Sequence, residues 1–154
     1  MRFTVTLASL IVLCVASPCF AGARQSGKVL MSSDPRGAKI QDDWGFSNSV
    51  ITGDTIYMSG VVVGLPEGES DLKAAYVRAF DHMGEILKEA GASWDDVVDI
   101  TSFHTDLISQ MPAIIEVKKR YVKPPHPAWT AIQVSRLIPP NGITEIKLVA
   151  KIAK

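Results

Sequence analysis

The spacing of apolar residues along the chain predicts two amphipathic helices. Across residues 71–90 the apolar side chains recur every three or four positions, which places them on one helical face. Ser70 is the predicted N-cap, and Gly91 follows the last turn at a position typical of a helix end. A second helix is predicted over residues 112–122, and the Pro-rich run 123–127 must end it.

Strands are predicted before, between and after these helices. Thr52-Gly53-Asp54 is a hairpin signal that divides residues 47–60 into two strands, and a loop follows at 64–68. Residues 24–45 mix Gly, Ser, Pro and Asp and are predicted to form an irregular arm. The remaining predicted strands are a short one near residues 28–31, then 97–107, 129–137 and 143–152.

This order of elements predicts the fold class. Strands separated first by helices and then by hairpins favour an α+β domain, in which a mixed β-sheet has two helices packed on one face. The last two strands flank a Pro-Pro-Asn-Gly turn. One domain, residues 24–154, leaves no element to cover the other face of the sheet, so self-association is the economical way to hide it.

The first 23 residues have the layout of a cleaved export signal. Arg2 is followed by the almost wholly apolar run 3–16, and the segment ends at Ala21-Gly22-Ala23. We therefore expect a secreted or periplasmic protein with no stable membrane association after cleavage. Cys14 and Cys19, the chain's two cysteines, lie in this segment. The mature domain would then have no disulfide, no thiol nucleophile and no Cys-ligated metal.

Charge and motifs argue against several partners. The 16 basic and 16 acidic residues balance, and no basic run is dense enough to predict nucleic-acid binding. No nucleotide- or cofactor-binding signature is present, and the three histidines lack partners at metal-ligand spacing, so neither a cofactor nor a metal is expected. For His104, a structural role with a backbone carbonyl as partner is favoured over that of a catalytic base.

Two polar residues are the strongest candidates for chemistry. Glu145 lies in an otherwise aliphatic strand beside Thr144. It is either a general base that orients a water for attack on a C=N carbon or part of an exposed strand face. Ser59, before Gly60, could offer a hydroxyl and an adjacent amide to an anionic group, or simply end a strand.

Five segments follow one another in a specific order and spacing along the chain: Trp44-Gly45-Phe46-Ser47, Ile56-Tyr57-Met58-Ser59-Gly60, Ala90-Gly91-Ala92 with Asp95-Asp96-Val97-Val98, Phe103-His104-Thr105-Asp106-Leu107, and Glu145-Ile146 with Ala150. Through them the sequence resembles the Rid superfamily, the YjgF/YER057c/UK114 proteins, over residues 37–152. The resemblance implies a chorismate-mutase-like fold assembled as a homotrimer, with small-molecule clefts between subunits.

The resemblance also implies roles for individual residues. Deaminases of the family place a Ser-Gly pair, an aromatic lid and a glutamate around the imine. The matching positions are Ser59 and Gly60, Phe46 or Trp44, and Glu145. By this correspondence Glu145 and Ser59 are catalytic, and the other three bind substrate.

Two further substrate-binding positions depart from the family pattern. The arginine that clamps the substrate carboxylate is replaced by Trp129, and the cysteine two residues later by Ala131. Loss of such a charge-assisted contact costs about 1.5–3 kcal/mol. This argues against classical 2-iminoacid deamination. Two functions remain open: an exported hydrolase of a small imine, enamine or related C–N compound, or a non-catalytic trimer that binds a small ligand or another protein.

Overall fold

The computed structural model describes residues 22–152. The predicted export signal, residues 1–23, lies almost entirely outside this part and stays a prediction. Within the described residues, no helix combines the length and the apolar character needed to cross a membrane.

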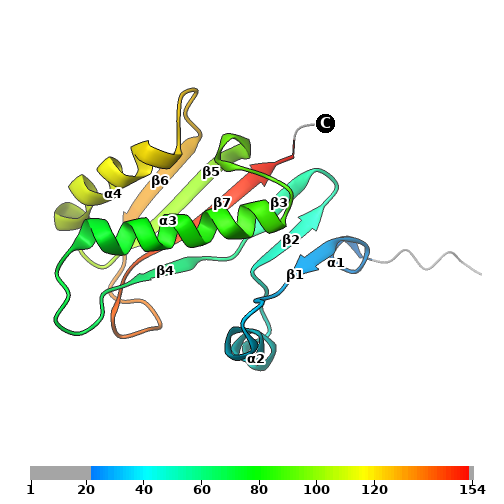
Figure 1. Ribbon diagram of the computed structural model, residues 1–154, viewed down its shortest axis with the longest axis horizontal. Helices are drawn as coiled ribbons and strands as arrows, with labels where there is room; N and C mark the ends of the chain where they lie inside the picture. Colours follow the sequence, from blue (N-terminus) through cyan, green and yellow to red (C-terminus); the bar gives the residue numbers. More distant parts are fainter. Residues whose placement is uncertain (1–21, 153–154) are drawn as a thin grey trace, which may run out of the picture.

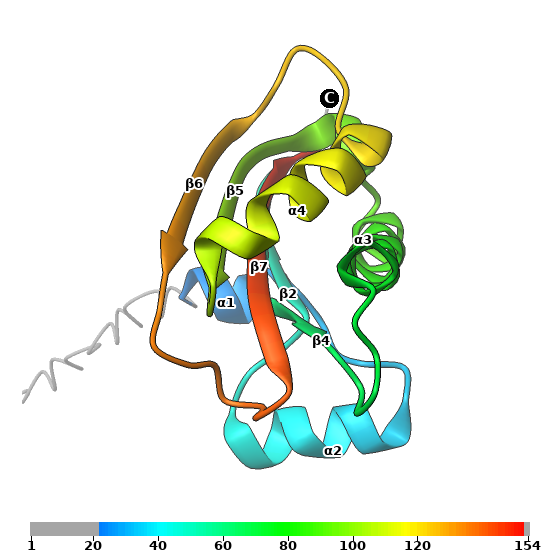
Figure 2. The ribbon, with the colours of Figure 1, turned by 90° about the vertical axis from the view of Figure 1, so that its left-hand side faces the viewer.

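A mixed, seven-stranded sheet forms the body of the protein, with helices α3 and α4 on one face (Figures 1 and 2). The predicted fold class is confirmed. The strands are β1 (Lys28–Leu30), β2 (Ser49–Thr52), β3 (Thr55–Met58), β4 (Val61–Gly64), β5 (Val97–His104), β6 (Ala128–Gln133) and β7 (Gly142–Lys151). The helices are α1 (Ala23–Ser26), α2 (Pro35–Trp44), α3 (Leu72–Glu89), a 3₁₀ turn (Trp94–Asp96) and α4 (Leu107–Tyr121).

Strand β7 is the centre of the sheet. It pairs antiparallel with β5 along one edge, and with β3 and β4 along the other. The chain passes from β5 through α4 to β6, and these two strands are therefore parallel, as a helical crossover requires. The predicted hairpin between the last two strands is wrong, because β5 lies between β6 and β7.

Helix α2 replaces the second half of the predicted irregular arm. Asp34 caps it by accepting a hydrogen bond from the Gly37 N–H at 2.9 Å, and Pro35 occupies the first turn. Gly45, with φ of 72°, ends it in the left-handed conformation. These start and stop residues were in the sequence, but the Gly, Ser, Pro and Asp composition suggested a loop. Figure 2 shows α2 lying across one end of the sheet, apart from α3 and α4.

Helix α4 begins earlier than predicted, at Leu107 rather than at residue 112. Asp106 caps it by accepting from the Ser109 N–H at 3.3 Å. Pro112 lies inside the helix instead of starting it. Strand β5 is correspondingly shorter than predicted and ends at His104. Strand β4, three valines and a glycine, was not predicted at all.

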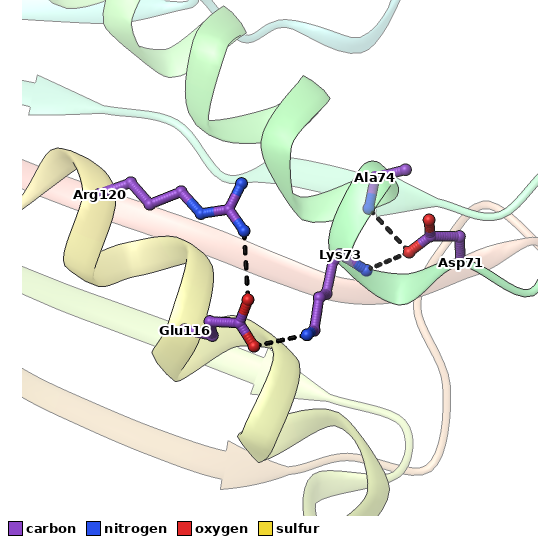
Figure 3. A network of polar contacts seen from close by, with 5 residues as sticks. All are labelled: Asp71, Lys73, Ala74, Glu116 and Arg120. Atoms are coloured by element: carbon purple, nitrogen blue, oxygen red, sulfur yellow. Dashed lines mark hydrogen bonds and ion pairs between the residues drawn. The ribbon is translucent and has the colours of Figure 1, made fainter.

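Polar contacts at the surface join the start of α3 to α4 (Figure 3). The α3 N-cap is Asp71 rather than the predicted Ser70, and its carboxylate accepts from the Lys73 N–H at 3.0 Å. The Lys73 ammonium lies 2.5 Å from Glu116, which also accepts from Arg120 at 3.2 Å. The hydrogen bond from Lys73 lowers the pKa of the Glu116 carboxyl. Because these side chains are about half exposed, such pairs add little stability.

The hydrophobic core lies between the sheet and helices α3 and α4. Its largest fully buried apolar side chains are Tyr76, Phe80, Met83 and Leu87 from α3, Ile114 from α4, and Ile56, Met58, Val63, Ile100, Ile146 and Leu148 from the sheet. Alternation along β7 turns Thr144 and Ile146 toward this core, so Glu145 and Lys147 point to the opposite face. That face of β5, β6 and β7 has no covering helix in residues 22–152 (Figure 2).

Candidate functional site

An open cavity of about 550 Å³ lies between α2 and the β4–β7 pair. Side chains from α2 form one wall, the two strands form the floor, and the loop after β6 completes the rim. The lining residues are Ile40, Trp44, Phe46, Ser59, Gly60, Val62, Ile138, Pro139 and Glu145. Five residues proposed from the sequence, Trp44, Phe46, Ser59, Gly60 and Glu145, are thus brought together in one chain.

Glu145 is the charged residue of this cavity. On the floor it lies directly across from Val62 of β4 and Phe103 of β5. No residue of the described chain forms a hydrogen bond or ion pair with its carboxylate. A carboxylate accepts hydrogen bonds through two oxygens, and burial in apolar surroundings without a partner is costly. Glu145 therefore has its full capacity to bind a water or a ligand.

Gly60 makes room for the glutamate. A Cβ built on Gly60 would lie 2.7 Å from both Cγ and Cδ of Glu145 and would collide with its carboxylate. The backbone between β3 and β4 therefore approaches the side chain as closely as only glycine permits. The sequence indicated the Ser-Gly pair for its hydroxyl and its amide. In the structure, glycine is needed at position 60 because any side chain there would collide with Glu145.

Ser59 is held by backbone carbonyls. Its hydroxyl donates to the Ser47 carbonyl at 2.7 Å, and its N–H donates to the Asn48 carbonyl at 2.9 Å. The hydroxyl and the N–H of Ser59 itself are thus already engaged and do not donate to an anionic group. In this arrangement the hydroxyl oxygen offers lone pairs, so Ser59 faces the cavity as a hydrogen-bond acceptor.

The aromatic wall is exposed yet well anchored. Trp44 is 62% exposed and Phe46 42% exposed. Gln41, buried on α2, accepts from the Ser32 N–H at 2.7 Å and donates to Asn48 Oδ1 at 2.5 Å. These bonds fix α2 to the segments that follow β1 and precede β2. Gln41 is not among the residues chosen from the sequence. Its only signal is a single glutamine in a segment whose composition predicts an irregular arm rather than a helix.

Trp129 and Ala131 lie elsewhere in the chain. They are opposite Ile100 and Ser102 of β5, on the face covered by helices. The Trp129 indole N–H donates to Ser102 Oγ at 3.0 Å, and Lys118 Nζ lies 3.8 Å from the centre of its ring. Desolvation lowers the pKa of Lys118. The structure thus does not bring Trp129 and Ala131 to the cavity of the same chain, and their place in an intersubunit cleft stays a prediction.

A buried polar network surrounds His104 on this helix-covered face. The ring Nδ1 lies 3.0 Å from Gln110 Oε1 and Nε2 lies 2.9 Å from Ser102 Oγ. Thr144 donates to the same Gln110 oxygen at 3.0 Å and is 2.7 Å from the Tyr76 hydroxyl. Since the Gln110 oxygen can only accept, we assign the ring proton to Nδ1, and Nε2 then accepts from Ser102.

Burial explains the charge state of His104, against the opposing effect of the hydrogen bond to Gln110. The residue is fully buried, and burial lowers the pKa of its imidazole, which is therefore neutral near pH 7. The predicted structural role fits this geometry, but its partners are side chains rather than a backbone carbonyl. No cavity in the described chain exposes the ring to a ligand.

A second cavity of about 540 Å³ lies beside the loop after β6, with Arg136, Asn141 and Thr105 in its lining. It includes none of the predicted site residues. The described chain also gathers no group of three or more His, Cys, Asp or Glu side chains able to hold a metal ion. The cavity with Glu145 is therefore the candidate site.

Comparison with known proteins identifies related sequences. A family model described as Endoribonuclease L-PSP matches residues 38–152. The RutC family protein YjgH of Escherichia coli (strain K12) is 37% identical over 110 residues, which cover 70% of this chain and 82% of that protein. The human 2-iminobutanoate/2-iminopropanoate deaminase is 36% identical over 110 residues, covering 68% and 78%. The solved structure of protein YJGH has a TM-score of 0.69 at 31% identity and covers 83% and 98%.

Proposed function

The chain belongs to the Rid superfamily of YjgF/YER057c/UK114 proteins, and on this premise we propose that it hydrolyses a small imine, enamine or related C–N compound in the cavity beneath α2. One observation carries the proposal. Glu145 presents a carboxylate without a partner among the described residues to a cavity whose lining, apart from Ser59, is apolar, aromatic or glycine, at a position that Gly60 keeps open.

Glu145 supports a complete hydrolytic step. Its carboxylate accepts a proton from a water as the water oxygen bonds to the C=N carbon, and the π electrons of that bond move to nitrogen. Glu145 then returns the proton to nitrogen. The C–N bond of the resulting carbinolamine then breaks as its hydroxyl proton passes through Glu145 to the departing nitrogen, and a carbonyl compound and an amine or ammonia leave. Imine and water are consumed in equal amounts.

The wall of the cavity supports this chemistry. Trp44 and Phe46 place two aromatic rings near the carboxylate, so a bound ligand would displace water from all but the attacking position. Ser59 adds an acceptor for an N–H of the substrate.

The description of the family as endoribonucleases suggests another substrate, which the cavity does not favour. Binding of an RNA backbone depends on Lys and Arg contacts to phosphates. The described residues that line the cavity include neither, and Glu145 would repel a phosphate. The 16 basic and 16 acidic residues of the chain also balance, so there is no net positive charge to attract a polyanion.

We further propose a homotrimer. On the uncovered sheet face Tyr57 is 48% exposed and Ile132 44% exposed, and contact with other subunits would bury both. Assembly would also bring the edge strand β6, with Trp129 and Ala131, to a neighbouring subunit. Light scattering should give about three times the monomer mass, and a stable monomer would refute the assembly.

Export to the periplasm or medium is proposed from the N-terminal segment. Arg2, the apolar run and Ala21-Gly22-Ala23 support it. N-terminal sequencing of the natively expressed protein should begin near Gly22 or Arg24. An intact Met1 in the cytoplasmic fraction would refute export.

A turnover assay tests the catalytic proposal. Imines are generated in place by an amine oxidase or an amino-acid oxidase in the presence of semicarbazide, which traps the reactive imine, and hydrolysis is followed as a fall in the initial rate of semicarbazone formation. We expect the wild type to accelerate hydrolysis of at least one imine and Glu145→Gln to lose about 100-fold or more. Glu67→Gln, in the exposed loop before α3, is the matched control and should retain full activity.

Two outcomes would overturn catalysis. Full activity of Glu145→Gln would remove the glutamate from the reaction. No acceleration of any imine, combined with saturable ligand binding in the cavity, would instead support the non-catalytic binding protein.

A further inference from the structure

Apart from Trp44, whose indole N–H is a single donor, the polar side chains that line the cavity beneath α2 are hydrogen-bond acceptors. Glu145 contributes two carboxylate oxygens, and Ser59 contributes lone pairs because its proton is committed to the Ser47 carbonyl. The remaining lining is apolar, aromatic or glycine. A ligand that fits these groups must bring the donors and the positive charge itself.

We propose that this cavity binds apolar organic cations, and that its substrates are protonated imines made from apolar amines and lacking a carboxylate group. Only the second part of this inference, the nature of the substrates, rests on the proposed hydrolytic function. Binding of the cation follows from the charge and shape of the cavity, whether or not turnover occurs.

The first argument is charge. A protonated imine carries its N–H and positive charge where Glu145 can accept a charge-assisted hydrogen bond, about twice as strong as a neutral one. A 2-imino acid would place a carboxylate in the same small space. No described lining residue is cationic: Lys147, on the same face of β7 as Glu145, is exposed and does not line the cavity, and Arg136 lines the second cavity.

The aromatic wall gives the second argument. The faces of tryptophan and phenylalanine rings attract cations, and tryptophan does so most strongly. Trp44 and Phe46 stand on the α2 side of the cavity while Glu145 lies on its floor, so a cation between them is held from two directions. The same protein already uses this interaction, since Lys118 lies over the ring of Trp129.

Size and shape give the third argument. Ile40 of α2 and Ile138 of the opposite rim leave an apolar space within about 550 Å³, which suits a group as large as a benzyl or branched alkyl chain. Such a group would cover apolar side chains that are otherwise open to water. Ile138 alone is 66% exposed.

Calorimetric titration with three ligands of nearly equal shape separates charge from size. Benzylammonium is the cation, benzyl alcohol the neutral analogue and benzoate the anion. We expect benzylammonium to bind about tenfold more tightly than benzyl alcohol, and benzoate to bind most weakly.

Variants then assign the preference. Glu145→Gln should bring benzylammonium to within about threefold of benzyl alcohol, because the charge partner is lost while the apolar contacts remain. Trp44→Leu changes an exposed residue and should weaken the preference in part, by loss of the cation–π contact. The Glu67→Gln control should behave as the wild type. Circular dichroism checks that each variant is folded.

The outcomes separate this inference from the hydrolytic proposal. Benzoate binding as tightly as benzylammonium, or a cation preference that stays at about tenfold in Glu145→Gln, would overturn the inference. Turnover of 2-iminopropanoate as fast as that of a benzylamine-derived imine would also overturn it, yet leave hydrolysis standing. A clear cation preference without any turnover would support the cation site and refute the hydrolase.

Discussion

Thr144 and Glu145 are consecutive residues of β7 with opposite surroundings. Thr144 faces helices α3 and α4, is fully buried, and shares hydrogen bonds with Tyr76 and Gln110. Glu145 faces the cavity and has no protein partner in the described chain. Buried polar groups that satisfy one another hold a fold in one arrangement, whereas a polar group kept without a partner is available for a ligand.

The strongest way to break the helix-side network is to remove its centre. His104→Ala leaves Ser102 and Gln110 without their ring partner and opens a cavity in the core. We expect a loss of about 3 kcal/mol in the free energy of unfolding. Urea denaturation at fixed protein concentration measures it. His82→Ala, on the exposed side of α3, should change stability by less than about 0.5 kcal/mol. A similar small change for His104→Ala would contradict the structural role.

Acid sharpens the same comparison with a smaller effect. Burial lowers the pKa of His104, so the folded protein keeps the ring neutral while the unfolded chain protonates it near the ordinary pKa of about 6.5. Stability is therefore fully present above this pH and is lost as the pH falls through it, by up to about 1.4 kcal/mol per pH unit.

Urea titrations at pH 7.5 and 5.5 isolate this contribution. His82 and His126 remain in both proteins, so the wild type should lose more stability on acidification than His104→Gln does. Equal losses in the two proteins would show that His104 is not responsible. Glu145→Gln should not alter the difference, because the glutamate lies on the other face of β7.

The sequence predicted best what short-range patterns encode. The three- and four-residue spacing between residues 71 and 90 predicted α3 almost to its ends. Helix α2 was missed because Asp34, Pro35 and Gly45 mark its limits individually, while the composition between them favoured a loop. The parallel pairing of β6 was not readable either, because it depends on how α4 crosses the sheet.

Some residues of the candidate site were predicted and others were not, again because short-range patterns are readable in the sequence and sheet register is not. Residues of the Ser59-Gly60 turn and Glu145 were chosen from motif and resemblance, and one cavity contains them. The side of the sheet on which Trp129 lies follows from its register with Ile100, which no local pattern gives. Only the fold shows that the hydroxyl and the N–H of Ser59 donate to the carbonyls of Ser47 and Asn48.

The most direct test compares the structural role of Thr144 with the catalytic role of Glu145. It measures imine turnover per folded protein in a single variant of each residue. Thr144→Val keeps its shape but loses the hydroxyl, and should lower stability by about 1–2 kcal/mol while the folded fraction retains turnover. Glu145→Gln should leave stability within about 0.5 kcal/mol and lose about 100-fold in turnover. The account would be contradicted if turnover per folded protein fell equally in both variants, or if only Thr144→Val lost it.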